Sequence, residues 1–140
     1  MTLYLDTSAL VKLYVEEIGS PDVAGLVRHA RLVVTSRVAY PEARAALARR
    51  QREGAIRQGD LRRAVTALDH DINAMFVVEL TASVARHAGD LAGRRRLRGF
   101  EAIHLASALE FGRTAGRAPR LLAFDDRLSR AALAEGLLPP

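Results

Sequence analysis

Short apolar runs, separated by longer stretches with helical periodicity, constrain the fold of this chain more than any other feature. The runs cover residues 3–5, 32–35, 75–80 and 121–124. They are continuous rather than alternating, as is typical of parallel strands that are buried on both faces. Strands that alternate with helices in this way predict an α/β domain, with a parallel sheet covered by helices on both faces.

Helical patterns fill the segments between these runs. The sequence predicts helices over residues 8–16, 20–30, 37–52, 59–73, 81–91, 100–111 and 128–134. Ser20 and Pro21 form an N-cap followed by proline at the first helical position, and Gly54 ends the third helix. No repeat, low-complexity tract or linker interrupts the series, so we expect a single domain over residues 1–140.

Composition excludes several classes of protein. With 140 residues, 49% of them hydrophobic, the chain can bury a core and does not resemble a disordered protein. It contains no cysteine, which excludes a disulfide scaffold, a thiolate zinc site and a cysteine nucleophile. An early Asp6 breaks any signal-peptide core, and no apolar run reaches the roughly 18–20 residues of a membrane span. We expect a soluble cytoplasmic protein.

Charge favours a nucleic-acid partner. The net charge is +5, and all of the 21 basic residues except Lys12 are arginine. The planar guanidinium matches phosphate better than the point charge of lysine does. A basic balance therefore favours nucleic-acid binding, although abundant arginine and alanine can equally reflect the base composition of a genome.

Acids follow two of the predicted strands directly. Asp6 ends the first strand, and Asp125 and Asp126 end the fourth. In parallel sheets ligands bind beyond the carboxyl ends of the strands, so both acids are candidates for one site. A purely structural interpretation of the first stays open: Thr7 or Ser8 can cap the next helix, and Asp6 favours its positive end.

Two further acids lie on helices that the sequence predicts to be buried. Glu42 projects from an apolar stripe, where a carboxylate needs a partner or a metal ion. A buried pair with an arginine from elsewhere in the chain is the alternative. The helix over 100–111 is apolar except for a stripe that includes Glu101 and His104. This stripe is expected to line a cavity, although a lone histidine there is more often a satisfied core residue.

Together Asp6, Glu42, Glu101 and Asp125 predict a site for a hard cation. Crowded carboxylates repel one another unless a cation compensates their charge, and oxygen ligands suit Mg²⁺ or Mn²⁺. The absence of cysteine and of an HExxH motif argues against zinc. A divalent ion held by carboxylates on an arginine-rich surface is typical of proteins that process phosphodiesters.

Motifs along the chain resemble those of a known family. DTSALVKLY, the Pro41-Glu42 segment with its RAAL continuation, AIHLASAL and FDDRL occur in this order between residues 3 and 130. They are similar to PIN-domain ribonucleases and, more closely, to the VapC toxins of bacterial toxin–antitoxin pairs. The resemblance implies a PIN-like three-layer α/β fold with about five parallel strands, a homodimer, and Mg²⁺- or Mn²⁺-dependent endonuclease activity on RNA. It also implies a VapB-like antitoxin whose tail fills the groove of the toxin.

Position by position, the resemblance also implies roles for single residues. The metal-site and catalytic carboxylates fall on Asp6, Glu42, Glu101 and Asp125, with Thr7, Ser8, His104 and Asp126 as supporting candidates. Two positions depart from the family pattern, which usually has Asp in place of Glu101 and a hydroxyl residue in place of Ala123. The arginines within 44–63 and 94–98 are candidates to bind the RNA backbone, or are simply solvated.

Two other functions remain as alternatives. A phosphotransfer domain would use Asp6 as a nucleophile, but it would need an aspartate at the position of Ser8 or a lysine beyond Lys12. A catalytically weakened PIN-like module would only bind RNA or a protein, and the longer side chain of Glu101 favours this interpretation. Cleavage of RNA in the presence of Mn²⁺ separates this module from an enzyme.

Overall fold

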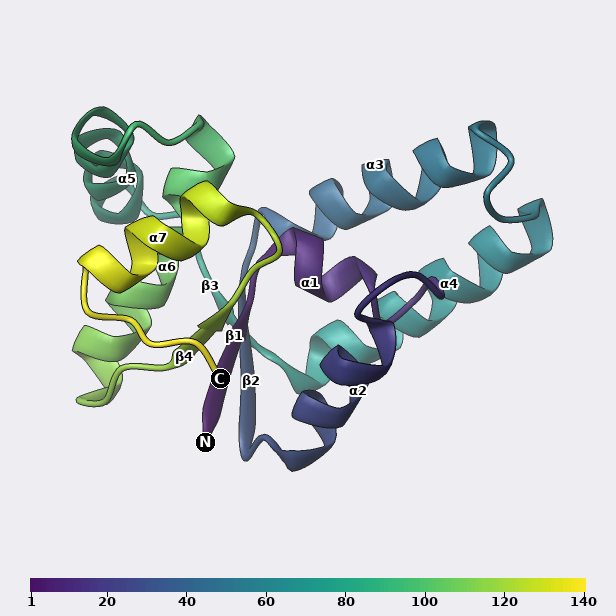
Figure 1. Cartoon of the computed structure of the whole chain (residues 1–140), viewed down its shortest axis with the longest axis horizontal. Helices are drawn as coiled ribbons and strands as arrows, with labels where there is room; N and C mark the ends of the chain where they lie inside the picture. The colour runs from purple at the N-terminus through teal and green to yellow at the C-terminus, as the bar shows by residue number, and fades with distance from the viewer.

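A parallel four-stranded sheet in the order β3-β2-β1-β4 forms the centre of the molecule (Figure 1). The structure is a computed structural model that describes all of residues 1–140. The strands are β1 (Thr2–Leu5), β2 (Leu32–Ser36), β3 (Phe76–Val78) and β4 (Arg120–Leu122). Each overlaps one of the predicted apolar runs, so the α/β fold with a parallel sheet is confirmed.

Helices cover both faces of the sheet (Figure 1). On one face lie α1 (Thr7–Val11), α2 (Ser20–His29), α3 (Ala39–Arg52) and α4 (Gln58–Asp71); on the other lie α5 (Ala82–Arg95), α6 (Gly99–Ala115) and α7 (Asp126–Ala134). The predicted first helix is too long, because the hydrogen bonds after Val11 change to those of tight turns. The fourth ends in a short 3₁₀ turn, η1 (Ile72–Ala74). None of the helices combines the length and apolar character that a bilayer span requires.

Side chains of β1, one of the two inner strands, point alternately into the two halves of the core. Leu3 and Leu5 pack with α1–α4, and Tyr4 packs with α5–α7. All three are completely buried. Successive side chains of a strand point to opposite faces, so β1 needs apolar or satisfied side chains at every position. This double burial accounts for the continuous apolar run at the start of the sequence.

The expected strand count of about five is wrong by one. The C-terminal tail lies beside β4, where a fifth strand would pair, and the carbonyl of Leu138 accepts a hydrogen bond of 3.0 Å from the amide of Leu121. The chain then continues as Pro139 and Pro140. Proline has no amide hydrogen to donate to a strand ladder, so the pairing does not extend into a strand.

Gly19 occupies a position that requires glycine. It is the N-cap of α2, so the prediction that Ser20 caps this helix is wrong by one residue. Its φ is 92°, and a Cβ atom added there would lie 2.8 Å from Cε1 of Phe124. Gly54 also has a positive φ of 78°, but a Cβ atom there would meet no heavy atom within 4 Å. A substitution at Gly54 would therefore introduce backbone strain alone, whereas one at Gly19 would introduce both strain and a steric clash.

Replacing Gly19 by alanine is predicted to destabilise the protein more than replacing Gly54. Strain at a positive φ lowers the free energy of unfolding by about 1–3 kcal/mol in both variants. Only Gly19→Ala also pushes against the Phe124 ring. Urea denaturation of both variants measures the difference. Equal losses would show that the ring moves away without resistance.

Candidate active site

Asp6 is held rigidly at the carboxyl end of β1. Its side chain is the N-cap of α1 and accepts hydrogen bonds from the amide of Ala9 (2.9 Å) and the hydroxyl of Ser8 (2.7 Å). The interpretation that Thr7 or Ser8 caps this helix is therefore wrong, because Asp6 does so itself. Burial raises the pKa of Asp6, and the charge of Glu42 raises it further, against the opposing effects of His104 and the hydrogen-bond donors.

Glu42 reaches the same region from the first turn of α3. Its Oε1 atom accepts hydrogen bonds from Thr7 Oγ1 at 2.6 Å and from His104 Nε2 at 2.8 Å. Burial alone would raise the pKa of Glu42, but these bonds outweigh it and lower the pKa below its usual value. The alternative of a buried pair with an arginine is therefore wrong, because a histidine and a threonine are the partners of Glu42. Both bonds fall on Oε1, and Oε2 has no hydrogen-bond partner.

His104 connects Glu42 to the core. The ring is almost fully buried, and its Nδ1 atom lies 3.0 Å from the hydroxyl of Tyr4. An ionised Glu42 can only accept, so Nε2 carries the hydrogen. At the other end of the ring, burial raises the pKa of Tyr4 well above its usual value, so that its hydroxyl keeps its proton beside Nδ1. His104 is therefore a satisfied core histidine that also orients Glu42.

Tyr4 is the residue of this network that the sequence analysis missed. Tyr4 lies within an apolar run that predicts a strand, where an aromatic side chain indicates a core position. A buried tyrosine nevertheless needs a partner for its hydroxyl. This requirement indicates that Tyr4 has a polar partner, but the partner, His104, lies 100 positions away in the sequence.

Asp125 approaches from the neighbouring strand. It is the N-cap of α7, and its Oδ1 atom accepts a hydrogen bond of 3.1 Å from the amide of Leu128. The loop before it is tied to the first acid, because the amide of Phe124 donates to Ser8 Oγ at 2.9 Å while Ser8 donates to Asp6. Asp126 is the first residue of α7.

Glu101 is turned towards its own helix. It stands at the start of α6, one turn before His104, and its Oε2 atom accepts a hydrogen bond of 3.0 Å from the backbone amide of Arg98. Its Oε1 atom lies 3.2 Å from Nε of the same arginine. Glu101 therefore satisfies a helix N-terminus in this structure.

The predicted acids lie around one end of the sheet without forming a complete ligand cluster. The charge of Glu42 raises the pKa of Asp6, and Asp6, Asp125 and Glu101 each accept a hydrogen bond from a local amide. No three histidine, aspartate or glutamate side chains lie close enough to hold an ion together. The donor chemistry still fits a hard divalent cation, because it is all oxygen and Glu42 Oε2 is free.

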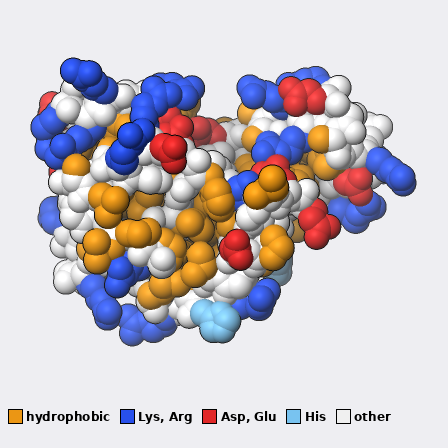
Figure 2. Space-filling view, in the orientation of Figure 1, with side chains coloured by type: hydrophobic (Ala, Val, Ile, Leu, Met, Phe, Trp, Pro, Cys, Tyr) orange, Lys and Arg blue, Asp and Glu red, His pale blue; other side chains and the backbone are white.

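A groove with basic walls adjoins these residues, between α1, α3 and the start of α6. Its volume is about 600 Å³. Figure 2 shows the molecule hollowed between the α3 arm and the α5–α7 side, with basic side chains on both. The polar residues that line the groove are Thr7, Ser8, Glu42, Arg49, Arg50, Arg52 and Arg98. The groove can therefore accept an anionic chain beside Glu42.

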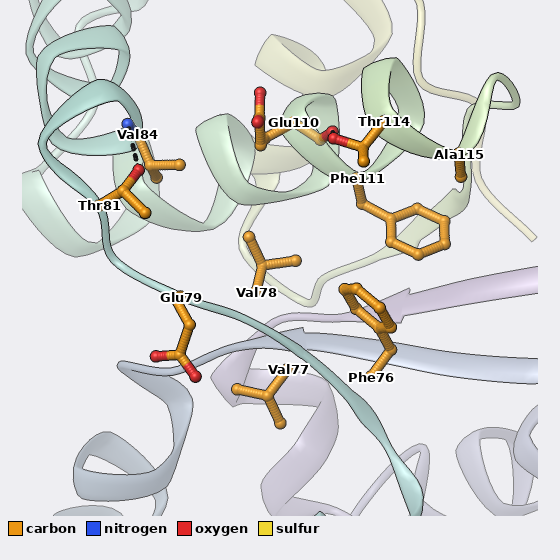
Figure 3. Close-up of a pocket in the computed structure, with 10 residues that line it drawn as sticks. All are labelled: Phe76, Val77, Val78, Glu79, Thr81, Val84, Glu110, Phe111, Thr114 and Ala115. Carbon is orange, nitrogen blue, oxygen red and sulfur yellow. Dashed lines mark hydrogen bonds between the residues drawn. The ribbon is translucent and has the colours of Figure 1, made fainter.

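A second hollow, of about 390 Å³, is apolar and lies at the free edge of β3 (Figure 3). Phe76 and Phe111 meet there edge to face, with ring centroids 5.1 Å apart. Thr81 caps α5 by accepting a hydrogen bond from the amide of Val84 (Figure 3). None of the predicted site residues lines this hollow, so the candidate chemistry belongs to the basic groove.

Solved structures share this fold. A crystal structure of Mycobacterium tuberculosis VapC20, described as a toxin that cleaves the sarcin–ricin loop, superposes with a TM-score of 0.72 over 99% of this chain and 98% of the other, at 21% identity. VapBC2 from Rickettsia felis, bound to a DNA fragment from its promoter, gives a TM-score of 0.66 over 100% of this chain and 98% of the other, at 10% identity.

Sequence comparison is more specific. Ribonucleases VapC45 and VapC49, from two strains of Mycobacterium tuberculosis, are each 44% identical to this chain over 110 residues, which cover 79% of it and 76% of the relative. The PIN domain family matches residues 3–133. With almost the whole chain matched and the fold in agreement, this protein belongs to the PIN domain family, in its VapC branch.

Proposed function

We propose that this protein is a divalent-metal-dependent endoribonuclease and the toxin of a VapBC-type toxin–antitoxin pair. The observation that carries the proposal is the pair of carboxylates, buried Asp6 and half-buried Glu42, beside a groove with four arginines. Relatives at 44% identity are named as ribonucleases. The proposal takes residues 1–140 as one PIN-like domain that acts in the cytoplasm as a homodimer.

Asp6 and Glu42 would hold Mg²⁺ or Mn²⁺, with Glu101, Asp125 and Asp126 as further candidates. A bound divalent ion supplies an acidic water for attack on phosphorus and neutralises the charge that develops. Thr7 and His104 hold Oε1 of Glu42 and leave Oε2 available. The Ser8 hydroxyl lies within hydrogen-bond distance of both oxygens of Asp6, at 2.7 Å from Oδ1 and 2.9 Å from Oδ2. A ligand on a rigid strand end keeps its position better than one on a mobile loop.

Arginines of the groove would bind the phosphates on either side of the cleaved bond. Arg49, Arg50 and Arg52 belong to the last turn of α3, and Arg98 precedes α6. Contacts to phosphates position an RNA without reading its sequence. They also make binding depend strongly on salt, because counterions are released.

A binding module without catalysis is the second candidate. The capping bonds of Glu101 and Asp125 favour it, because each acid is occupied by backbone amides. Asp125 uses only Oδ1 for its amide and could still bind an ion through Oδ2, whereas both oxygens of Glu101 are engaged by Arg98. A cleavage assay separates the two candidates.

The enzyme is expected to cut single-stranded RNA internally with Mg²⁺ or Mn²⁺ and to stop in EDTA. Gel analysis of a labelled RNA measures this. Glu42→Gln should abolish cleavage, whereas Asp90→Asn, at an exposed acid on α5, should leave it unchanged. Cutting that persists in EDTA would contradict the metal-dependent mechanism, and binding without cutting would favour the module.

Asp6→Asn is expected to raise stability without metal and to lower cleavage by orders of magnitude. Burial raises the pKa of Asp6 above its usual 3.8. Between these two pKa values the native state binds a proton that the unfolded chain lacks, so the wild type loses stability as the pH rises through this window. Asparagine caps equally well and has no such dependence.

Urea denaturation in EDTA from about pH 4 to about pH 8 checks this prediction. The advantage of Asp6→Asn should grow as the pH rises and then level off above the raised pKa. Metal-induced stabilisation should shrink in the same variant, because an ion stabilises only as far as it binds the native state. An Asp6→Asn protein that cuts RNA at the wild-type rate would refute the metal site.

A VapB-like antitoxin is expected to bind the groove and suppress cleavage. Its inserted segment should carry apolar anchors and a basic residue that meets Asp6 and Glu42. Co-expression with the neighbouring small open reading frame, followed by purification and an RNA assay, tests this prediction. A complex that forms but leaves cleavage intact would place the antitoxin elsewhere on the surface.

A further inference from the structure

Phe124 is an exposed aromatic residue at the edge of the candidate site. It lies between β4 and Asp125, and 46% of its surface is accessible. Its backbone amide donates a hydrogen bond to Ser8, which in turn donates to Asp6. The ring is therefore attached to a backbone segment that is tied directly to the proposed metal ligands.

The Phe124 ring is held in place without being buried in the core. The Nζ atom of Lys12 lies over one face, 4.5 Å from the ring centroid. Lys12 is itself fixed by Glu17 at 3.2 Å and by the carbonyl of Ile18 at 2.8 Å. Gly19 lies against the ring edge, where a side chain would not fit. The lysine and the glycine thus orient a half-exposed ring and leave its other face for a ligand.

Other exposed phenylalanines lack this combination. Phe76 is exposed to a similar degree, 48%, but it packs edge to face on Phe111 in the apolar hollow. Phe100 is exposed beside Glu101, yet no aromatic or cationic group stacks on its ring. Phe124 alone among the exposed phenylalanines has a cation over one face and a hydrogen-bonded link to Asp6.

We propose that Phe124 is a stacking platform for one unpaired nucleobase of the RNA, next to the phosphodiester that is cleaved. Proteins recognise single-stranded RNA by stacking splayed bases on aromatic rings, and each base has a face that can stack. The arginine-lined groove would hold the backbone while Phe124 holds a base. The inference rests on the proposed function, and it adds the residue that would hold one unpaired base beside the cleaved bond.

The chain contains no tryptophan, so Phe124→Trp introduces a single fluorescent reporter. In an Asp6→Asn background, which keeps RNA intact, adding an unpaired RNA oligonucleotide should quench the tryptophan emission. The quenching should saturate together with the anisotropy of a labelled RNA. Phe76→Trp, equally exposed but in the apolar hollow, is the matched control and should show no quenching. A fully double-stranded RNA should quench neither reporter.

A second set of variants tests the ring directly. Phe124→Leu should weaken binding of unpaired RNA about tenfold, whereas Phe124→Tyr should retain it. Thermal melts confirm that both variants are folded. RNA binding with unchanged emission at position 124, or full affinity in Phe124→Leu, overturns the platform and leaves the proposed function intact. Absence of RNA binding in every variant overturns both the platform and the proposed function. If the tryptophan emission changes with the antitoxin but not with RNA, the ring at position 124 contacts a protein partner instead.

Discussion

The hydrogen-bond chain from Tyr4 through His104 to Glu42 is the interaction on which the rest of the site depends. It joins the central strand, the buried helix α6 and the start of α3. Its direction is set by proton positions, since the buried tyrosine donates and the ionised glutamate accepts. Each member satisfies a polar group that would otherwise be buried without a partner. The chain therefore stabilises the core and at the same time holds one carboxylate at the surface.

Helix N-termini hold the other acids. Asp6, Glu101 and Asp125 each accept hydrogen bonds from amides at the start of α1, α6 or α7. Such bonds fix a carboxylate in position, but they also compete with a ligand for its oxygens. Glu42 differs, because side chains supply its hydrogen bonds and only one oxygen is used. Asp125 also uses only one oxygen, so Glu42 and Asp125 can both bind a ligand without giving up a hydrogen bond.

The two hollows of the surface differ in their polarity. The basic groove beside Glu42 suits an anionic chain, and the apolar hollow at the β3 edge suits no charged ligand. Arginines dominate the groove, and their planar forks match phosphate geometry. Acidic side chains at the end of the sheet and arginines on the groove walls therefore lie close to each other. A cation bound between the acids would allow a phosphate to bind there, because it neutralises the carboxylates that would otherwise repel the phosphate.

Local sequence patterns determined the elements and the positions of the acids. Apolar runs, helical periodicity and capping residues act over a few neighbours, so the strands, the helices and the acids at strand ends were predictable. The cap of α1 was misassigned by one or two residues, because an N-cap depends on backbone angles that a pattern does not fix. Family motifs added the proposed roles of the candidate site residues, which local pattern alone left open to several interpretations.

Tertiary structure alone decided the strand order β3-β2-β1-β4 and the partners of the buried acids. Glu42 meets His104 across 62 positions of sequence, and no local propensity encodes a pairing at that distance. The same holds for Lys12 and Gly19 against Phe124, which come together only because β1 and β4 are neighbours. Residues that are close in sequence determined which groups reach the end of the sheet. Packing determined which of them touch, because contacts between distant segments exist only once the sheet has formed.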